Sequence, residues 1–128
     1  MIHVDTHVLV WLYEGKPERL GDGARDLLDS EQLTASPMAA LELTWLKESG
    51  RINPEPTEIL AWLTRELGLT VDATPFAAVA AEAATETFAF TRDPFDRLIA
   101  ANARAAGVRL LTKDRRLRNQ LDFAIWPD

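Results

Sequence analysis

Residues 92–114 read RDPFDRLIAANARAAGVRLLTKD, and this stretch combines the signals of a helix and of a strand. Asp93 and Pro94 form a typical helix start, because Asp is a preferred N-cap and Pro fits the first helical position. Gly107 is the expected end of the helix. The apolar run 108–112 then predicts a strand. A long helix followed at once by a short strand is the repeating unit of an α/β fold.

The same alternation of short apolar runs and helical segments continues over the rest of the chain. Strands are predicted at residues 1–5, 33–35, 69–71, 108–112 and 123–126. Helices are predicted from Thr6 to a break at Lys16-Pro17, over 17–30 and 37–49, between Pro54 and Gly68, from Pro75, from Pro94 to Gly107, and around Leu117. We therefore expect one α/β domain over residues 1–128, a three-layer α/β/α sandwich with a central, mostly parallel sheet.

The composition limits the class of protein. Apolar residues make up 47% of the 128 positions and charged residues 27%, which is typical of a globular chain. Because there is no Cys, disulfides, thiolate nucleophiles and thiolate zinc sites are excluded. No apolar run approaches the roughly 20 residues that cross a membrane, and no signal peptide is visible. We expect a cytoplasmic protein without membrane contact.

The net charge of −6 is unevenly distributed along the chain. Residues 1–91 carry 6 basic and 15 acidic side chains, whereas residues 92–128 carry 8 basic and 5 acidic ones. An acidic chain is poorly suited to nucleic acid, because contacts to phosphates supply most of the non-specific affinity. The basic segment is either a local exception or an ordinary solvated surface. Its candidates for contacts with a nucleic-acid backbone are Arg92, Arg97, Lys113, Arg115 and Arg116.

Four acidic residues occupy positions that suggest a shared site. Asp5 ends the first predicted strand and Asp114 follows the fourth, so both belong at the carboxyl edge of the sheet, where open parallel sheets bind ligands. Glu42 has only apolar helical neighbours, so it reaches water, has a raised pKa or meets a cation from elsewhere. Asp96 serves the helix cap, the helix dipole or a metal, whereas capping is a sufficient role for Asp93.

Carboxylates gathered at one edge repel one another unless a cation offsets their charge or some of them take up protons. Oxygen ligands in a chain without Cys favour Mg²⁺ or Mn²⁺ over zinc. Water made more acidic by such a metal is a nucleophile near neutral pH, and a phosphodiester is a natural substrate for it. Such chemistry reconciles an acidic protein with an anionic substrate.

Several of these segments together resemble a PIN-domain ribonuclease of the VapC toxin type. They are Val4-Asp5-Thr6, Glu42, the segment from Arg92 to Arg97 followed by Ala100-Ala101, and the segment from Leu111 to Asp114. The resemblance extends over essentially the whole chain, and Asp-Pro-Phe-Asp-Arg is its most specific part. The last segment, 121–128, matches only loosely.

The resemblance implies a compact α/β/α sandwich and cleavage of RNA that depends on Mg²⁺ or Mn²⁺. It implies that Asp5 and Asp96 contact the metal directly. Glu42 is then expected to orient or activate the water, and Asp114 to complete the acidic pocket. It further implies a VapB-type antitoxin, a homodimer and a role as the toxin of a type II toxin–antitoxin system in the cytoplasm. The residues expected to stand behind the ligands are Thr112 and Thr6.

Two other interpretations stay open at this point. A receiver-like signalling domain fits the size and the α/β pattern, with Asp72 as the phosphoacceptor and Lys113 after a strand, although the first strand offers only Asp5. A PIN fold without catalytic activity, acting as a binding module, is the other. His3 and His7 are interpreted as packing or surface residues. Stacking on bases is open to Trp11, Trp45, Trp62 and Trp126, but three of them lie in helical apolar patterns, so packing in the core or against a partner is expected instead.

Overall fold

The structure is a computed structural model that describes residues 1–128. Its five strands run parallel in one sheet, in the order β3-β2-β1-β4-β5. The strands are β1 (Ile2–Val4), β2 (Leu33–Ala35), β3 (Thr70–Val71), β4 (Arg109–Leu111) and β5 (Ala124–Ile125). The helices are α1 (Thr6–Glu14), α2 (Gly21–Ser30), α3 (Pro37–Glu48), α4 (Pro56–Leu67), α5 (Phe76–Ala83), α6 (Pro94–Ala106) and α7 (Arg115–Gln120).

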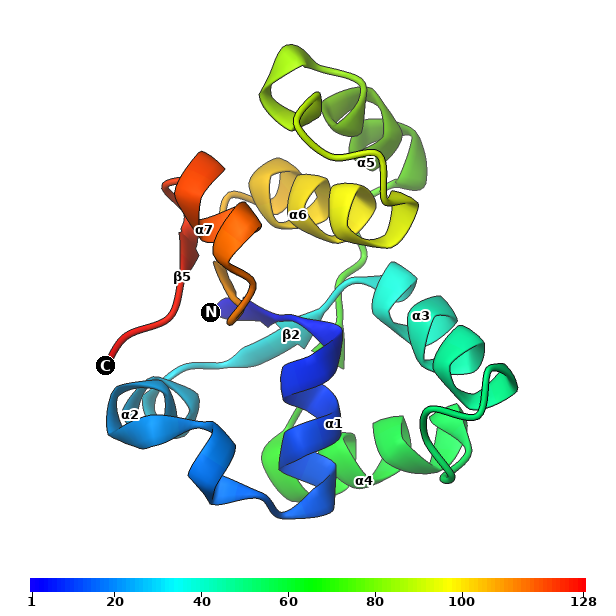
Figure 1. The fold of residues 1–128 in the computed structure, drawn as a ribbon, viewed down its shortest axis with the longest axis vertical. Coiled ribbons are helices and arrows are strands. Elements are labelled where there is room, and N and C mark those ends of the chain that lie inside the picture. Colours follow the sequence, from blue (N-terminus) through cyan, green and yellow to red (C-terminus); the bar gives the residue numbers. More distant parts are fainter.

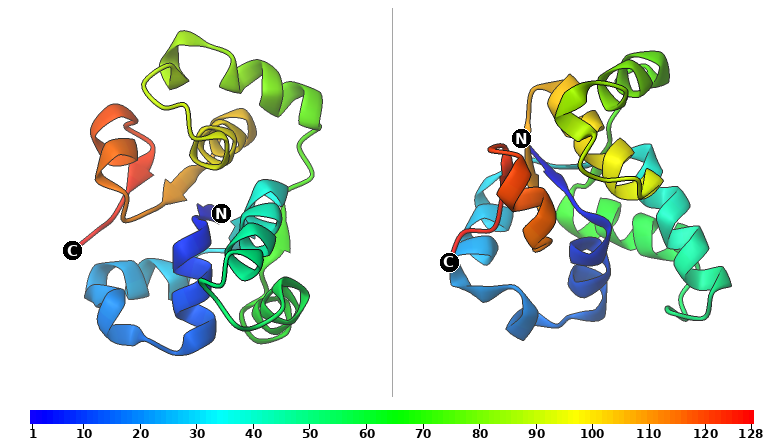
Figure 2. Two further views of the ribbon diagram at one scale, coloured as in Figure 1. Left: turned by 45° about the vertical axis from the view of Figure 1, so that its right-hand side comes forward. Right: turned by 45° about the horizontal axis from the view of Figure 1, so that its top comes forward.

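Helices cover both faces of the sheet, which confirms the expected three-layer α/β/α sandwich. α1, α2 and α4 lie on one side of the sheet and α5, α6 and α7 on the other (Figures 1 and 2). α3 packs against both α4 and α6, so it joins the two helical layers at one end of the molecule. None of the helices is both long and apolar enough to cross a membrane.

Polar residues fix where four of the helices begin, and three of these residues come after a strand. Asp5 is the N-cap of α1, and Ser36 is the N-cap of α3, where its hydroxyl accepts a hydrogen bond from the Met38 amide. Asp93 and Asp114 cap α6 and α7 in the same way. These caps satisfy amide groups that a helix leaves unpaired at its start. They also hold carboxylates at the carboxyl edge of the sheet.

The predicted helix over residues 17–30 is wrong in one respect. A 3₁₀ turn at Pro17–Arg19 comes first, and the α-helix begins only at Gly21. Gly21 has a φ of 73°, a left-handed conformation that interrupts a continuous right-handed helix. The predicted strands are confirmed, with ends that differ by one or two residues at most.

The core is built where α6 lies on the sheet. Ile2 and Val4 of β1 are at most 1% exposed, and Ile99 of α6 is equally buried. Ala100, Ala101 and Ala103, also on α6, are completely buried. Small side chains let the helix axis approach closely, and this approach places the start of α6 beside the end of β1.

Candidate active site

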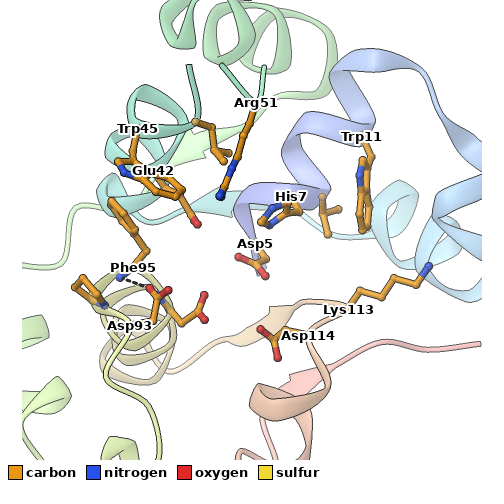
Figure 3. Close-up of a pocket in the computed structure, with 14 residues that line it drawn as sticks. Asp5, His7, Trp11, Glu42, Trp45, Arg51, Asp93, Phe95, Lys113 and Asp114 are labelled. Carbon is orange, nitrogen blue, oxygen red and sulfur yellow. Dashed lines mark hydrogen bonds between the residues drawn. The ribbon is translucent and has the colours of Figure 1, made fainter. Parts of the chain in front are cut away.

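A cavity of about 640 Å³ opens beyond the ends of β1 and β4, and it contains all four acidic residues expected to form a site. Figure 3 shows Asp5, Glu42, Asp93 and Asp114 turned toward the same space from four separate segments of the chain. The lining consists of Asp5, His7, Val8, Trp11, Glu42, Trp45, Leu46, Arg51, Asp93, Pro94, Phe95, Asp96, Lys113 and Asp114. The expected convergence of the acidic residues is therefore present.

Asp5 is held rigidly at the centre of this edge. One carboxylate oxygen accepts a hydrogen bond from the Thr6 amide at 2.8 Å, and the other accepts one from the Thr112 hydroxyl at 2.6 Å. The Asp5 amide also donates to the Leu111 carbonyl, which ties the end of β1 to β4. Burial raises the pKa of Asp5, and the two hydrogen bonds oppose that rise.

Glu42 reaches the cavity from the side of α3. It is 8% exposed, and its Oε1 atom is buried without a hydrogen-bond partner. Burial is the main reason why the pKa of Glu42 is raised. The nearby Thr6 hydroxyl opposes this rise, although no hydrogen bond of acceptable geometry joins the two side chains. Glu42 therefore has an unused acceptor at the cavity.

Asp93 and Asp96 have different tasks at the start of α6. One Asp93 oxygen accepts hydrogen bonds from the amides of Phe95 and Asp96, at 2.9 and 3.1 Å, which confirms its capping role. The carboxylate of Asp96 makes no such bond. Burial first, and then the carboxylates of Asp93, Asp5, Asp114 and Glu42, raise the pKa of Asp96 to about 7. Asp96 therefore experiences the combined negative charge of the cavity.

Asp114 completes the edge next to β4. Its Oδ1 atom accepts hydrogen bonds from the amides of Arg116 and Leu117 and so caps α7. The Asp114 amide donates to the Thr112 hydroxyl at 3.1 Å, while that hydroxyl donates to Asp5. Thr112 is fully buried and links two of the four carboxylate residues. Thr112 thus connects the side chain of Asp5 to the backbone of Asp114.

The donors of the cavity fit a hard divalent cation. Five carboxylates line the cavity, those of Asp5, Glu42, Asp93, Asp96 and Asp114, and the buried Oε1 atom of Glu42 is an acceptor without a partner. No three Asp, Glu or His side chains stand close enough to form a ready-made ligand set. The carboxylates would have to draw closer around a cation, which mutual repulsion prevents without one.

The five basic residues proposed for nucleic-acid contacts differ in whether their side chains already donate hydrogen bonds within the protein. Arg97 donates to the carbonyls of Ala83 and Thr91, and Arg116 donates to that of Phe90. Lys113 alone of the five lines the cavity. The two whose side chains are exposed without a hydrogen bond or an ion pair are Arg92 and Arg115.

Sequence reasoning did not single out Arg51 and gave Trp45 no place in the site. Trp45 was expected to pack in the core or against a partner; it is 42% exposed and lines the cavity, so it is not a core residue. Arg51 lies over its ring, with the guanidinium carbon 4.7 Å from the ring centroid. Nothing in the local pattern marks Arg51, because it follows Gly50 in a segment without regular structure. The position of Trp45, three residues after Glu42, was a usable signal.

His3 and Asp72 form a separate buried network outside the cavity. The Asp72 carboxylate accepts hydrogen bonds from the Asn102 amide group and the Thr74 backbone amide, and it lies 3.1 Å from His3 Nε2. Burial lowers the pKa of His3, whereas hydrogen bonds lower the pKa of Asp72 to about 2. His3 is therefore a packed residue, as expected. His7, in contrast, is exposed and lines the cavity.

Fold and site together define a parallel α/β/α protein with an acidic cavity at the carboxyl edge of its sheet. Residues 2–120 match the PIN domain family, and the chain belongs to this family. Ribonuclease VapC22 of Mycobacterium tuberculosis is 40% identical over 119 residues, which cover 91% of this chain and 88% of that protein.

Solved structures support the same fold. A toxin–antitoxin complex from Klebsiella pneumoniae matches with a TM-score of 0.68 at 17% identity, covering 98% of this chain and 96% of that one. VapBC2 of Rickettsia felis, bound to a DNA fragment from its promoter, matches with a TM-score of 0.67 at 16% identity and full coverage of both chains. At such low identity, these likenesses establish the architecture.

Proposed function

We propose that residues 1–128 form a single domain that acts as a metal-dependent endoribonuclease, the toxin of a type II toxin–antitoxin system. One observation carries this proposal: carboxylates from four separate segments line one cavity at the carboxyl edge of the sheet. Membership of the PIN family and the 40% identity to a protein named as a ribonuclease support it.

Asp5 and Asp96 are the proposed direct ligands of Mg²⁺ or Mn²⁺. Asp5 is held by Thr6 and Thr112, so its carboxylate needs little reorganisation. The Asp96 carboxylate accepts no hydrogen bond, and burial and the neighbouring carboxylates raise its pKa to about 7, so a cation beside it would relieve this repulsion. When bound, such a cation offsets the charge on the phosphate and makes water more acidic.

Glu42 is proposed to orient the attacking water and to take up its proton. Its buried Oε1 atom has a free acceptor position, and its raised pKa makes it a better base than an exposed Glu. Asp114 completes the pocket beside Thr112, which fixes the separation between Asp114 and Asp5. The side chains proposed to hold the metal and the water are thus kept in place by hydrogen bonds or by burial before any substrate binds.

The proposed substrate is RNA, and the proposed partner is a VapB-type antitoxin protein. Solved complexes of similar fold include toxin–antitoxin assemblies, and this likeness is the reason for proposing that partner. We further propose that the protein forms a homodimer and acts in the cytoplasm. Arg92 and Arg115 are the remaining candidates for contacts with the RNA backbone, because the side chains of Arg97, Arg116 and Lys113 donate to carbonyl groups of the chain.

Cleavage of a single-stranded RNA by the purified chain tests the proposal. We expect cleavage with Mg²⁺ or Mn²⁺, none with excess EDTA, and at least a hundredfold slower rate for Asp5→Asn and Asp96→Asn. Asp26→Asn is the matched control, because Asp26 is exposed on α2 and outside the cavity. Equal rates for wild type and both site variants, all folded by circular dichroism, would reject the mechanism.

The two alternatives make different predictions. A receiver-like domain needs an accessible phosphoacceptor, but Asp72 is held by hydrogen bonds and lies outside the cavity. The membership of the PIN family also speaks against that class. An inert binding module would leave RNA intact with every divalent metal, which the cleavage assay detects directly.

A further inference from the structure

We propose that Arg51, held over the ring of Trp45, binds an RNA phosphate next to the one that is cleaved. The inference rests on the proposed ribonuclease function and goes beyond it by naming the contact that draws an anionic strand to an acidic cavity. Arg51 is assigned as a substrate-binding residue, and Trp45 as the residue that positions it.

An acidic cavity needs nearby positive charge before a phosphate can enter it. Only two basic residues with permanent charge line the cavity, Arg51 and Lys113. Lys113 is already engaged, because its Nζ atom donates to the Arg19 carbonyl and lies 5.7 and 5.6 Å from the rings of Trp11 and Trp126. The guanidinium of Arg51 makes no hydrogen bond or ion pair. Arg51 therefore has the free donors that a phosphate requires.

The backbone fixes where Arg51 emerges. α3 ends at a turn in which Gly50 adopts a φ of 77°, and the Arg51 amide donates to the Leu46 carbonyl at 2.9 Å. This bond spans the last turn of the helix and closes it in the manner of a Schellman motif. Arg51 is thereby turned back along α3, on the side that faces the cavity (Figure 3).

The ring of Trp45 holds the guanidinium near the acidic residues. Trp45 is three residues after Glu42 on α3, so the two side chains share one face, about 4.5 Å apart along the axis. Phe95 of α6 supports the ring, with a centroid separation of 6.0 Å. A guanidinium stacked on a ring keeps its N–H edge free and can bind a phosphate with two parallel hydrogen bonds.

The test compares Arg51→Ala with Arg25→Ala, each assayed on a single-stranded RNA oligonucleotide over a series of salt concentrations. Arg25 is a matched control, because it is exposed on α2, has no partner and lines no cavity. We expect Arg51→Ala to raise KM about 10- to 100-fold with little change in kcat. The slope of log KM against log salt should fall by about 0.7, the value of one phosphate contact to a single strand. Arg25→Ala should resemble wild type.

Two further variants separate positioning from charge. Arg51→Lys retains the charge without the planar, stacked donor, so it should recover the salt slope but only part of the KM. Trp45→Phe keeps a ring and should be close to wild type, whereas Trp45→Leu should raise KM. Melting temperatures report whether each variant is folded.

The outcomes distinguish the inference from the function on which it rests. Normal RNA cleavage by Arg51→Ala, with unchanged KM and salt slope, would overturn the inference and leave the ribonuclease intact. Absence of RNA cleavage and RNA binding in the wild type would remove both. If Arg51→Ala binds RNA as well as wild type does but binds a purified partner protein less well, the Arg51–Trp45 pair serves a protein surface. That result would likewise overturn the inference.

Discussion

Replacing Asp96 by Asn should stabilise the protein while slowing the proposed RNA cleavage at least a hundredfold. The pKa of Asp96 is raised from 3.8 to about 7, since its negative charge is partly buried among other carboxylates. At pH 8 the folded protein must carry that unfavourable charge, and the unfolded chain carries the same charge in water. Asparagine has a similar shape and no charge, so it removes the penalty.

The magnitude follows from the size of the shift. Each pKa unit corresponds to about 1.4 kcal/mol, so roughly three units set an upper limit of about 4 kcal/mol. Asp96 is partly exposed, and solvent, salt and relaxation reduce this value, as does the loss of a favourable charge at the start of α6. We expect a gain of about 1–2 kcal/mol at pH 8. For a domain of this size, that gain raises the melting temperature by about 4–8 °C.

The pH dependence gives this prediction a definite sign. Between pH 4 and 7 the folded state holds a proton on Asp96 that the unfolded state has lost, so wild-type stability falls as pH rises through this range. The advantage of Asp96→Asn should therefore be largest at pH 8 and vanish near pH 4.

Urea denaturation of wild type, Asp96→Asn and Asp26→Asn at pH 5 and 8, in EDTA and in Mg²⁺, measures this effect. Mg²⁺ should stabilise wild type more than Asp96→Asn, because a cation offsets the same repulsion. Equal stabilities of wild type and Asp96→Asn at pH 8 in EDTA would refute the argument that the site is under electrostatic strain.

Three other substitutions test the supports of the site and fold. Thr112→Val removes the hydroxyl that donates to Asp5, so metal affinity by titration should fall about 10- to 100-fold, whereas Thr112→Ser should preserve it. Gly23→Ala should destabilise the fold by about 1–3 kcal/mol, because a Cβ there would collide with the backbone of Asp128. Deletion of the last two residues should restore the stability of this variant. An unchanged melting temperature of Gly23→Ala would refute the clash. Asp72→Ala should lower the free energy of unfolding by about 2 kcal/mol at pH 7. Because hydrogen bonds depress the pKa of that carboxyl to about 2, the loss should become progressively smaller from pH 4 down to pH 2. A loss of stability that urea titrations find to be independent of pH would contradict this cause.

Local signals made much of the fold predictable. Asp93-Pro94 and Gly107 mark both ends of α6, and the apolar run before Thr112 marks β4, because caps and strand propensity act over a few residues. The break at Gly21 was missed, since a Gly–Asp–Gly sequence is compatible with both a helix and a turn. Whether this segment is a helix or a turn depends on the left-handed φ of Gly21, which is seen only in the folded chain.

The acidic residues of the site were predictable for a related reason. In a parallel sheet all strands end at the same edge, so a carboxylate just after each strand is brought to one place by topology alone. Asp5 and Asp114 follow that rule, and Glu42 was marked by its apolar neighbours. Arg51 obeys no such rule. Its position depends on how α3 ends and on the packing of Trp45 against Phe95, which are tertiary facts.

The charge distribution of the protein follows from what the site must do. Carboxylates that are held close together repel one another when no cation is present, so in the proposed metal site the repulsion that weakens the folded state would also favour metal binding. The raised pKa of Asp96 reflects this strain. An acidic cavity also repels the substrate, so positive charge must lie close to it without neutralising its carboxylates. Stacking on Trp45 holds Arg51 in such a position, near the cavity and unpaired with any acid. Removal of Arg51 should therefore weaken substrate binding without strengthening or weakening the binding of the metal, and metal titration of Arg51→Ala in the absence of RNA checks this separation.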